Sequence, residues 1–510
     1  MQLFDYIIIG GGTAGCVLAN RLSAKSNLSI LLIEAGGPYR HPILPIPMMG
    51  GLTYTIKSTN WNYETAPDAF LNDRRVPWPR GKILGGTSSI NGMMYVRGHK
   101  WDYDNWASNG ASGWSYNDVL PYFKFSEGHQ DRSNEYHGNT GPYLVTKSKS
   151  NNQLYNIFLK ACAEAGHPST DDFNGHQQEG VGRQDFNIVN GRRICSANAY
   201  LKPVIKRRNL KVITHAHATK LLLKDNQVTG VEYLKGGTRG AKNKAYANSE
   251  VILCGGTVNS PTLLQLSGIG DPKQLGSVGI TTNVPLPAVG KNLQDHLGAY
   301  VQHHCLKPIT LYRYFRADQA ALALARVLLF GNGPGASIAL EGGGFLRTRE
   351  NLEIPDIQIT FIPGLSLDTT QRKQGKHGFL THFYLMRPKS RGQIMIQSTD
   401  PFIGPKIEPH SLIAEDDRSI MRDGVKLVRN IMSQSAFEPY RGEEISPGKH
   451  ILSDIEIDSW IKANATTVWH PTGTCRMGID QNSVVDPQLR VHGIKNLRVV
   501  DASIMPEIIG

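Results

Sequence analysis

The chain has 510 residues, 40% of them hydrophobic, and it carries a formal net charge of +12. This length and composition allow a large buried core and predict two or more domains. The longest apolar stretch, near residues 320–330, is too short to span a bilayer and contains Arg326. The basic residues are not interleaved with aromatic side chains, as they are on nucleic-acid-binding platforms. The composition therefore argues against a membrane-spanning protein and against nucleic acid as a partner.

Six cysteines are scattered along the chain without a C-x-x-C pair. This spacing favours reduced thiols in a cytoplasmic protein and implies no metal site. Because the first strand is expected almost at Met1, no leader peptide is predicted. The excess positive charge has two interpretations, a solvated basic surface or attraction to an anionic membrane surface. We therefore expect a cytoplasmic protein, with peripheral association at the inner face of the cell membrane as the second interpretation.

A glycine-rich turn at residues 10–15 follows an apolar run at residues 6–9 and precedes a helical stretch at residues 16–22. In this context the G-x-G-x-x-G pattern is a dinucleotide-binding fingerprint. The glycines permit a tight turn and close backbone approach, and the helix N-terminus then faces a pyrophosphate. A second strand at residues 29–33 leads to Glu34, and 34 − 15 = 19 residues is the spacing expected of a ribose-binding carboxylate. An acidic residue there favours FAD or NAD over NADP.

After Glu34 the chain enters a Pro- and Gly-rich excursion, residues 36–79, that we expect to cover part of the site. A second glycine-rich turn follows at residues 81–91. Farther along, hydrophobic periodicity predicts helices over residues 154–162, 257–266 and 420–431. Apolar runs between turn residues predict strands over residues 211–216, 220–224, 228–234, 251–254, 356–361, 379–386, 393–397 and 496–501.

The strand at residues 251–254 is followed by a glycine turn and a helix, and the last strand is again of the buried parallel type. The strands after residue 300 are separated by turns as in an antiparallel sheet. The sequence therefore predicts an α/β fold (α+β overall), in which a Rossmann-like domain is interleaved with a domain built on an antiparallel sheet flanked by helices. We assign residues 1–150, 192–298 and 464–510 to the Rossmann-like domain and residues 151–191 and 299–463 to the second.

Two further stretches carry recognisable motifs. Residues 81–91 are rich in glycine and hydroxyl side chains, and residues 256–270 place a proline in a first helical turn and glycines past the helix end. Together they resemble the signature motifs of the glucose–methanol–choline (GMC) oxidoreductases, a family of FAD enzymes. The resemblance covers essentially the whole chain in order, and it also includes residues 5–15, 289–296, 470–478 and 499–506. It looks most like the bacterial branch of alcohol and choline dehydrogenases.

The resemblance implies which residues hold FAD. The first glycine turn and Glu34 would bind the ADP half, and the second glycine turn would line the pyrophosphate and flavin. Backbone at Ala218 would contact the adenine, and Asp501 and Ala502 would lie by the ribityl chain and isoalloxazine. The other implied cofactor-binding residues are Gly10, Gly12, Thr13, Ala14, Gly15, Ala35, Gly85, Gly86, Ser89, Asn91, Gly92 and Met93. Some relatives carry a histidine that links covalently to the flavin, but that slot is Ile90 here, so the resemblance implies non-covalent FAD.

His470 is the expected catalytic residue. Trp469 and Pro471 flank it, a Gly-Thr turn follows, and its position matches the base of the family. An imidazole can accept the proton of an alcohol hydroxyl because its pKa lies near working pH, while a hydride leaves for flavin N5. Three other histidines are interpreted as structural or pocket-lining, because no metal-ligand pattern accompanies them: His296, His303 and His304.

The resemblance implies an FAD-dependent dehydrogenase that oxidises a primary alcohol to an aldehyde and passes electrons to a quinone or another acceptor. One alternative is an alcohol oxidase of the same fold that uses O₂. Another is a flavin-binding protein without turnover, because the family ordinarily continues some tens of residues beyond Met505 and Pro506 with a second histidine or asparagine, whereas this sequence stops at Gly510. The apolar stretch at residues 322–330 is interpreted as core, with the lining of an entrance for aliphatic or aromatic alcohols as the alternative.

Overall fold

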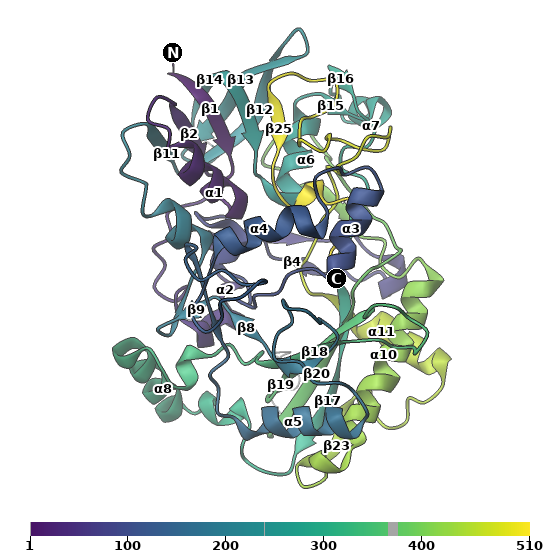
Figure 1. Ribbon diagram of the computed structural model, residues 1–510. Coiled ribbons are helices and arrows are strands. Elements are labelled where there is room, and N and C mark those ends of the chain that lie inside the picture. The colour runs from purple at the N-terminus through teal and green to yellow at the C-terminus, as the bar shows by residue number, and fades with distance from the viewer. Residues whose placement is uncertain (1, 239, 366–375) are drawn as a thin grey trace.

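The computed structural model describes residues 2–238, 240–365 and 376–510. Figure 1 shows one large sheet at the top of the molecule and a second at the bottom. The N-terminus begins a strand of the upper sheet, and the C-terminus lies near the middle of the view. Strands from both ends of the sequence, β1 and β25, belong to the upper sheet.

The upper sheet has the strand order β11-β2-β1-β14-β13-β12, with β25 beside β14. The strands β11, β2, β1, β14 and β25 run parallel, whereas β13 is antiparallel to both of its neighbours. The strands of this sheet are β1 (Gln2–Ile9), β2 (Ile30–Ile33), β11 (Leu210–Ile213), β12 (Ala216–Lys224), β13 (Gln227–Lys235), β14 (Ala241–Leu253) and β25 (Leu497–Val499). Strands far apart in the sequence thus share one sheet.

The parallel strands are apolar because both faces of the sheet are covered. Ile7 and Ile8 of β1 point to opposite faces, and both are fully buried. Ile7 belongs to the cluster that contains Leu264 of α6 (Gly256–Leu266), whereas Ile8 packs with Cys16 of α1 (Thr13–Leu22). The glycine turn between β1 and α1 is therefore held at a fixed edge of a rigid sheet.

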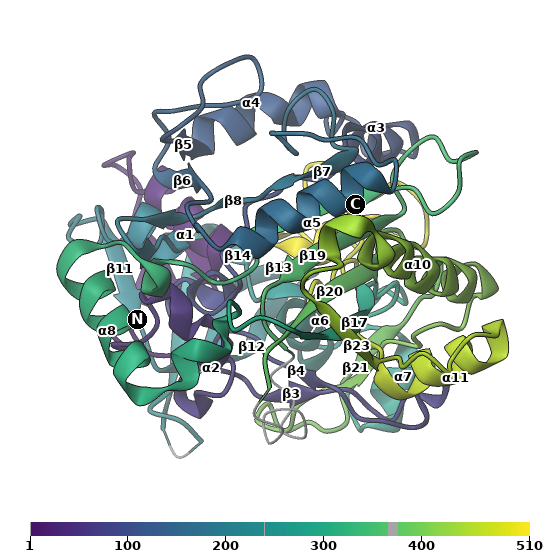
Figure 2. The ribbon, with the colours of Figure 1, turned by 90° about the horizontal axis from the view of Figure 1, so that it is seen from below.

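The lower sheet has the order β23-β17-β20-β19-β18-β7, with β24 beside β17, and all of its pairs are antiparallel. Helices α5 (Gln153–Glu164) and α10 (Glu415–Ser433) cross one of its faces, as Figure 2 shows. The strands are β7 (Gly180–Arg183), β17 (Leu297–Cys305), β18 (Gly342–Leu346), β19 (Ile357–Ile362), β20 (Gly378–Leu385), β23 (Arg441–Ser446) and β24 (Thr466–Thr467). The mixed α/β fold that the sequence predicts is confirmed, and the domain limits stay a prediction.

The remaining elements surround these sheets. Among the described residues the other helices are α2 (Gly50–Thr53), α3 (Lys100–Ser108), α4 (Tyr116–Ser126), α7 (Pro272–Ser277), α8 (Ala317–Phe330) and α11 (Asp454–Asn464). The short strands are β3 (Tyr63–Glu64), β4 (Pro77–Trp78), β5 (Glu127–His129), β6 (Tyr143–Lys147), β8 (Asp185–Phe186), β9 (Ile188–Val189), β10 (Arg192–Arg193), β15 (Ile269–Gly270), β16 (Val284–Pro285), β21 (Gln393–Met395) and β22 (Lys406–Glu408).

The predicted helices correspond to α1, α5, α6 and α10, and every predicted strand overlaps a strand of the structure, although most of their ends differ. One prediction differs further, because the strand expected over residues 211–216 ends at Ile213 and a new strand starts at Ala216. His215 between them has a φ of +54°, which interrupts an extended strand. The backbone turns there, and the His215 N–H donates to the Gly36 carbonyl at 2.8 Å.

The interpretation of residues 322–330 as core is wrong. These residues belong to α8, in which only Ala323 and Val327 are buried. Leu322, Leu329 and Phe330 are 64%, 75% and 72% exposed. Within the described residues, no helix has both the length and the apolar content needed to cross a membrane. All six cysteines are buried and have free thiols.

Candidate functional site

The carboxyl ends of four parallel strands meet at one edge of the upper sheet. Gly10 follows β1 and donates its N–H to the Ile33 carbonyl at the end of β2. Cys254 follows β14 and bonds to Ile9, while Val500 follows β25 and bonds to Leu253. Ligands of open α/β sheets bind at this edge. The first glycine motif, the α6 motif and the C-terminal motif are therefore neighbours in space.

The glycine turn after β1 has conformations that other residues avoid. Gly10 has a φ of +105°, and a Cβ on it would lie 2.3 Å from the Cys254 carbonyl oxygen. A Cβ on Gly15 would lie 1.9 Å from the carbonyl oxygen of Gly10. Gly12 is the N-cap of α1, and neither a side-chain cap nor an acidic residue occurs in its first turn. The N–H groups of Thr13 and Ala14 therefore have no side-chain cap among the described residues, an arrangement that suits an anion.

Glu34 ties the end of β2 to this turn. Its Oε2 accepts from the Gly11 N–H and its Oε1 from the Gly36 N–H, both at 2.7 Å. Burial raises the pKa of Glu34 to about 7, although the two backbone hydrogen bonds favour the ionised form. Ala35 lies between these anchors and is partly exposed. The predicted ribose-binding carboxylate is thus beside the fingerprint turn, where its position suits a ribose.

The second glycine-rich turn closes over the first. Gly85 donates its N–H to the Gly11 carbonyl at 2.7 Å and has a φ of +90°. A Cβ on Gly86 would lie 2.7 Å from the Cα of Gly12. This contact brings the two turns together as closely as backbones allow, and only glycine permits it.

The residues after Gly86 continue along this edge. Ser89 is fully buried and donates its hydroxyl to the Leu84 carbonyl. Asn91 accepts at Oδ1 from the N–H of Met93, which is buried with a φ of +59°. Gly92 between them is partly exposed. Ser89 therefore shapes the turn from inside, while Asn91 and Gly92 are accessible.

Arg193 holds this turn in place, and sequence reasoning missed it. The side chain is 1% exposed, and its Nε donates to the Leu44 carbonyl at 3.0 Å. Its Nη1 donates to the Asn91 carbonyl at 2.7 Å and to the Asn91 Oδ1 at 2.8 Å. Among the described residues its Nη2 has no hydrogen-bond partner. A single arginine in a short hairpin gives no sequence signal of such a role.

The residues expected to contact the adenine and the flavin lie at two places along this edge. Ala218 is partly exposed on β12, two residues after Ala216, whose N–H donates to the Glu34 carbonyl at 2.9 Å. Asp501 accepts from the Gly256 N–H at 2.9 Å and from the Ser260 hydroxyl at 2.6 Å. The side chain of Asp501 thus fixes the start of α6. The partly exposed Ala502 begins a short 3₁₀ helix, Ala502–Ile504.

His470 lies beside His296 where β24 meets the start of β17. The two Nδ1 atoms are 3.0 Å apart, and His296 Nε2 is 2.8 Å from the Met386 carbonyl oxygen. A carbonyl oxygen only accepts, so Nε2 of His296 carries the hydrogen. Burial and the neighbouring His470 hold the pKa of His296 well below its usual range, so the ring is neutral and its Nδ1 accepts. His470 therefore donates from Nδ1, which leaves its Nε2 with a free lone pair.

Asp295 fixes the backbone of His470. Its Oδ1 accepts from the His470 N–H at 2.7 Å, and its other oxygen accepts from the Thr467 hydroxyl. On the other side, Arg80 donates from Nη2 to the Trp469 carbonyl at 2.6 Å. Trp469 has a φ of +65°, an uncommon conformation outside glycine. These contacts fix the backbone turn that carries the His470 imidazole.

The surroundings keep His470 neutral. Burial lowers its pKa to about 4, and the Arg80 guanidinium adds to this effect. The residue nevertheless has solvent-exposed surface. The ring of Tyr384 lies 6.4 Å from that of His470, and Tyr54 lies 4.6 Å from Trp469. The excursion of residues 36–79 therefore reaches the neighbour of His470 through Tyr54, and its covering of the site stays a prediction.

The other two histidines interpreted as structural lie farther along β17. His303 is buried, with Nε2 3.9 Å from a Glu444 oxygen. His304 is partly exposed on the same strand. The sequence interpretation of His296 as structural or pocket-lining understates its part, because it bonds directly to His470.

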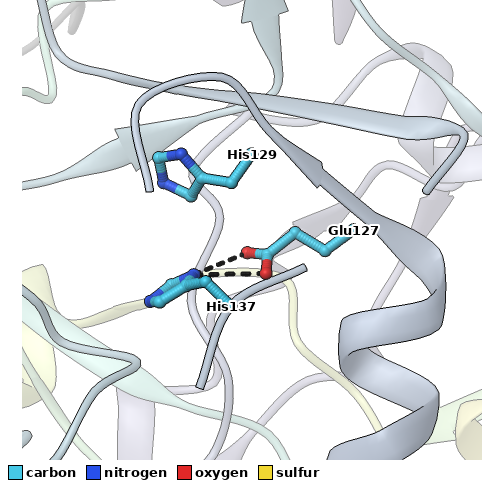
Figure 3. A group of neighbouring side chains, drawn as sticks. All are labelled: Glu127, His129 and His137. Carbon is cyan, nitrogen blue, oxygen red and sulfur yellow. Dashed lines mark hydrogen bonds and ion pairs between the residues drawn. The ribbon is translucent and has the colours of Figure 1, made fainter. Parts of the chain in front are cut away.

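A separate group of Glu127, His129 and His137 has the composition of a metal site (Figure 3). His137 Nδ1 lies 3.0 Å from a Glu127 oxygen, and its Nε2 lies 2.9 Å from an Asp172 oxygen. Arg97 donates to Glu127 at 2.9 Å. The positive guanidinium occupies the position beside the carboxylate that a cation would need.

The remaining histidine of this group is also fully engaged. His129 Nε2 lies 3.1 Å from an Asp185 oxygen, and its Nδ1 accepts from the Asp131 N–H at 3.2 Å. Burial alone would lower the pKa of His137, but hydrogen bonds to Asp172 and Glu127 outweigh it and raise that pKa. The group is therefore an ion-pair network that joins β5 to β8, which carries Asp185, and to the loop that carries Asp172.

The residues at the sheet edge fit FAD. The uncapped N-terminus of α1 offers N–H groups to a pyrophosphate, and the contact between Gly12 and Gly86 requires two bare backbones. Arg193 Nη2 and Thr472 Oγ1 are buried without a hydrogen-bond partner among the described residues. Pro471, next to His470, accepts from the Thr257 hydroxyl of α6 at 2.7 Å. The sheet edge therefore suits a dinucleotide, and the turn that carries the His470 imidazole is bonded to it.

Comparison with known proteins identifies the family. The models of the GMC oxidoreductase family match residues 4–298 and 388–510. The sequence is 44% identical over 514 residues to an oxygen-dependent choline dehydrogenase of Yersinia pestis, which covers 99% of this chain and 90% of the relative.

Two solved structures are similar over 99% of this chain. Pyridoxine 4-oxidase from Mesorbium loti has a TM-score of 0.89 and 30% identity, with 95% of that chain covered. A variant of formate oxidase from Aspergillus oryzae, studied for FAD modification, has a TM-score of 0.92 and 27% identity, with 94% covered. The chain belongs to the GMC oxidoreductases, a family of FAD-binding enzymes.

Proposed function

We propose that this chain oxidises a primary alcohol to an aldehyde, with His470 as the group that takes the hydroxyl proton. One observation carries the proposal: the hydrogen-bond chain from the Met386 carbonyl through His296 leaves Nε2 of His470 unprotonated. An alcohol hydroxyl that donates to this nitrogen would lose its proton as a hydride leaves the carbon that bears the hydroxyl. When bound, FAD supplies the acceptor for that hydride.

We also propose that FAD is held by a Rossmann-like sheet edge in the positions described above. Backbone N–H groups of Gly12, Thr13 and Ala14 would bind the pyrophosphate, and Glu34 would bind the ribose. The second glycine turn, from Gly85 to Met93, would line the flavin side. Because Ile90 is apolar and fully buried, no nucleophile stands at that position to bond to the ring, and the cofactor would be held without a covalent link.

His470 is pre-organised for its role by the groups around it. Asp295 holds its backbone and Arg80 holds the preceding carbonyl. Arg80 also adds positive charge near His470, which would stabilise a negatively charged alkoxide that develops there. The low pKa of His470 keeps the base unprotonated at neutral pH. The rate of proton transfer would therefore depend on the position of the His470 imidazole more than on its intrinsic basicity.

The aromatic side chains near His470 favour choline as a substrate candidate. Tyr300 stacks on His382 at 4.2 Å between ring centroids, and Tyr384 lies next to His382 at 5.2 Å. With Tyr54 and Trp469 these rings supply π faces to which a quaternary ammonium group is attracted. The relatives named choline dehydrogenase support the same candidate. Electrons would then pass to a quinone or another acceptor.

The test is anaerobic mixing of the purified protein with choline and a panel of primary alcohols while the visible flavin band is followed. We expect the band to bleach with a subset of these alcohols. The His470→Gln variant should keep its flavin and bleach at least about 10²-fold more slowly. A yellow wild-type protein that no alcohol reduces would contradict the proposal and would favour a flavin-binding protein without turnover.

A second candidate is an oxidase that passes electrons to O₂. It is favoured by the solved structures that resemble this chain, which include a pyridoxine 4-oxidase and a formate oxidase. Peroxide release in air, measured with the alcohol that bleaches the flavin, separates the two. Stoichiometric peroxide indicates the oxidase, whereas slow reoxidation in air and fast reoxidation by a quinone indicate the dehydrogenase.

A further inference from the structure

Helix α8 presents an apolar face to solvent. Its outward side carries Leu322, Leu328 and Leu329, which are 64%, 49% and 75% exposed, and Phe330 at its end is 72% exposed. The opposite side rests on the protein through Ala323 and Val327. Figures 1 and 2 both place α8 at the edge of the molecule. Contiguous exposed apolar side chains of this kind mark an interaction surface.

Basic residues surround this face. Arg313, Arg316 and Arg326 are exposed around and along α8, and Asp318 is the acidic residue of the helix. Three arginines and one aspartate give this segment, residues 313–330, a formal charge of 3 − 1 = +2. The Asp318 carboxylate is paired with Arg316 at 3.0 Å. An apolar helix face with a cationic border is the pattern of helices that lie in a membrane interface.

We propose that α8 docks this protein on an anionic phospholipid bilayer, with its leucine face inserted at the level of the acyl chains and its arginines at the headgroups. The charge of the border suits acidic lipids. A second copy of this chain would bring the same arginines together, on a molecule whose net charge is already +12. One face of a 14-residue helix is also small beside the roughly 800 Å² per partner of a stable protein interface.

The contacts of α8 join this surface to the candidate cofactor site. A Cβ on Gly191 would lie 2.7 Å from Val327 and 2.8 Å from the carbonyl of Gly331, so the end of α8 rests on the hairpin of β9 and β10 that carries Arg193. After α8, Leu340 packs on Gly92, where a Cβ would lie 3.4 Å away. A bilayer at α8 would therefore lie next to the elements that frame the second glycine turn, from where a lipid-soluble quinone could approach.

This inference goes beyond the proposed alcohol oxidation, and its test needs no turnover. The purified full chain is mixed with vesicles of phosphatidylglycerol and phosphatidylcholine, or of phosphatidylcholine alone, and the bound fraction is measured by flotation. We expect binding to the anionic vesicles that weakens with salt. The L322Q/L329Q variant should lose at least about tenfold in partitioning, because two leucines no longer leave water.

The matched control is I455Q, which changes an equally exposed apolar residue, 79% exposed at the start of α11. It should bind as the wild type does, and both variants should keep the wild-type melting temperature because all three side chains are exposed. The proposal is overturned if wild-type protein stays off anionic vesicles at low salt, or if L322Q/L329Q binds as tightly as I455Q. It is equally overturned if the wild type ignores vesicles and forms a dimer that L322Q/L329Q abolishes. Flavin bleaching by alcohol is unaffected by any of these outcomes, so the two proposals fail separately.

Discussion

The Nδ1 atom of His296 lies 3.0 Å from the Nδ1 atom of His470, and a main-chain carbonyl on the far side of His296 determines which ring donates. Both rings are neutral, so each has one donor and one acceptor nitrogen. The order carbonyl, His296, His470 therefore has one consistent arrangement of hydrogens. Under the proposed function, it makes His296 a positioning residue that would act on the reaction through His470.

Replacing His296 should slow proton transfer without loss of flavin. In His296→Phe the Nδ1–H of His470 loses its acceptor, so the ring can rotate or change tautomer, and we expect kcat to fall by about 10² or more. His296→Gln can still accept from His470 and donate to Met386, so it should recover part of that loss. Steady-state rates at fixed flavin content measure the difference.

The matched control for His296 is His303→Phe, which alters a buried histidine seven positions farther along the chain, on β17. It should leave kcat near the wild-type value. Equal losses in the Phe variants at both positions would show that the effect is structural and would remove the positioning role.

The acid limb of the activity profile should reflect the low pKa of His470. Burial, with Arg80 as the second cause, lowers this pKa to about 4. The base is therefore lost only as pH falls through about 4, and kcat/KM should be level between about pH 6 and 8. In Arg80→Met one of the two causes of the low pKa is removed, so the acid limb should shift to higher pH. Arg80→Lys keeps the positive charge and should leave the acid limb at low pH.

The same lowered pKa affects stability with a defined sign. The unfolded chain takes up a proton near the ordinary pKa of histidine, whereas folded His470 does so near 4. Between these values the unfolded state binds more protons, so the free energy of unfolding falls as the pH falls. Circular dichroism at each pH separates this loss from the kinetic limb. An acid limb of kcat/KM with a pKa near 6.5, measured where the wild-type protein is folded, would contradict the expected environment of His470.

Much of the site could be predicted because its chemistry depends on short local patterns. The turn at Gly10 to Gly15 and the carboxylate of Glu34 follow from glycine conformations and strand spacing, which are visible in the sequence. The contact of Arg193 with Asn91 and that of His296 with His470 join residues about 100 and 174 positions apart. Such pairs depend on how distant segments of the chain are placed in the fold, and no local sequence pattern indicates that placement.

The exposed face of α8 shows that a local apolar pattern can also predict burial wrongly. Leu322 and Leu329 have the spacing of an ordinary buried helix face, and apolar composition predicts burial. The structure places Ala323 and Val327 inward instead, because Val327 packs against the close turn at Gly191. Hydrophobicity alone does not tell which side of an apolar helix faces the protein.

Arg193 should matter for cofactor affinity more than for the base. Without its guanidinium, the carbonyls of Leu44 and Asn91 lose their donor in a buried position, which costs about 1–3 kcal/mol for each unsatisfied group. We expect Arg193→Met to weaken FAD binding by about tenfold or more. Flavin fluorescence released on dilution gives the dissociation constant. Arg192→Met, which alters the exposed neighbour on β10, is the control and should bind FAD as the wild type does.

The flavin should leave the protein when the protein unfolds. Ile90 is fully buried and offers no group that could bond to the ring. Acid precipitation of the holoprotein should therefore leave all yellow colour in the supernatant, and mass spectrometry of the pellet should give the mass of the bare chain. A pellet that keeps its colour would show a covalent link through another residue and would remove this part of the proposal.

The network around His137 should stabilise the fold most strongly at low to neutral pH. Hydrogen bonds to Asp172 and Glu127 raise the pKa of His137 above its ordinary value. The folded state thus holds a proton that the unfolded state releases above about pH 6.5, so this stabilisation is complete below that pH and is lost as the pH rises through the folded pKa. In His137→Gln the melting temperature should fall, by an amount that shrinks between pH 6 and 9. His176→Gln, at an exposed histidine, should change nothing. Because both ring nitrogens of His137 already have partners, Zn²⁺ should leave the melting temperature of the wild type unchanged, and a clear rise would instead reveal a metal site at Glu127.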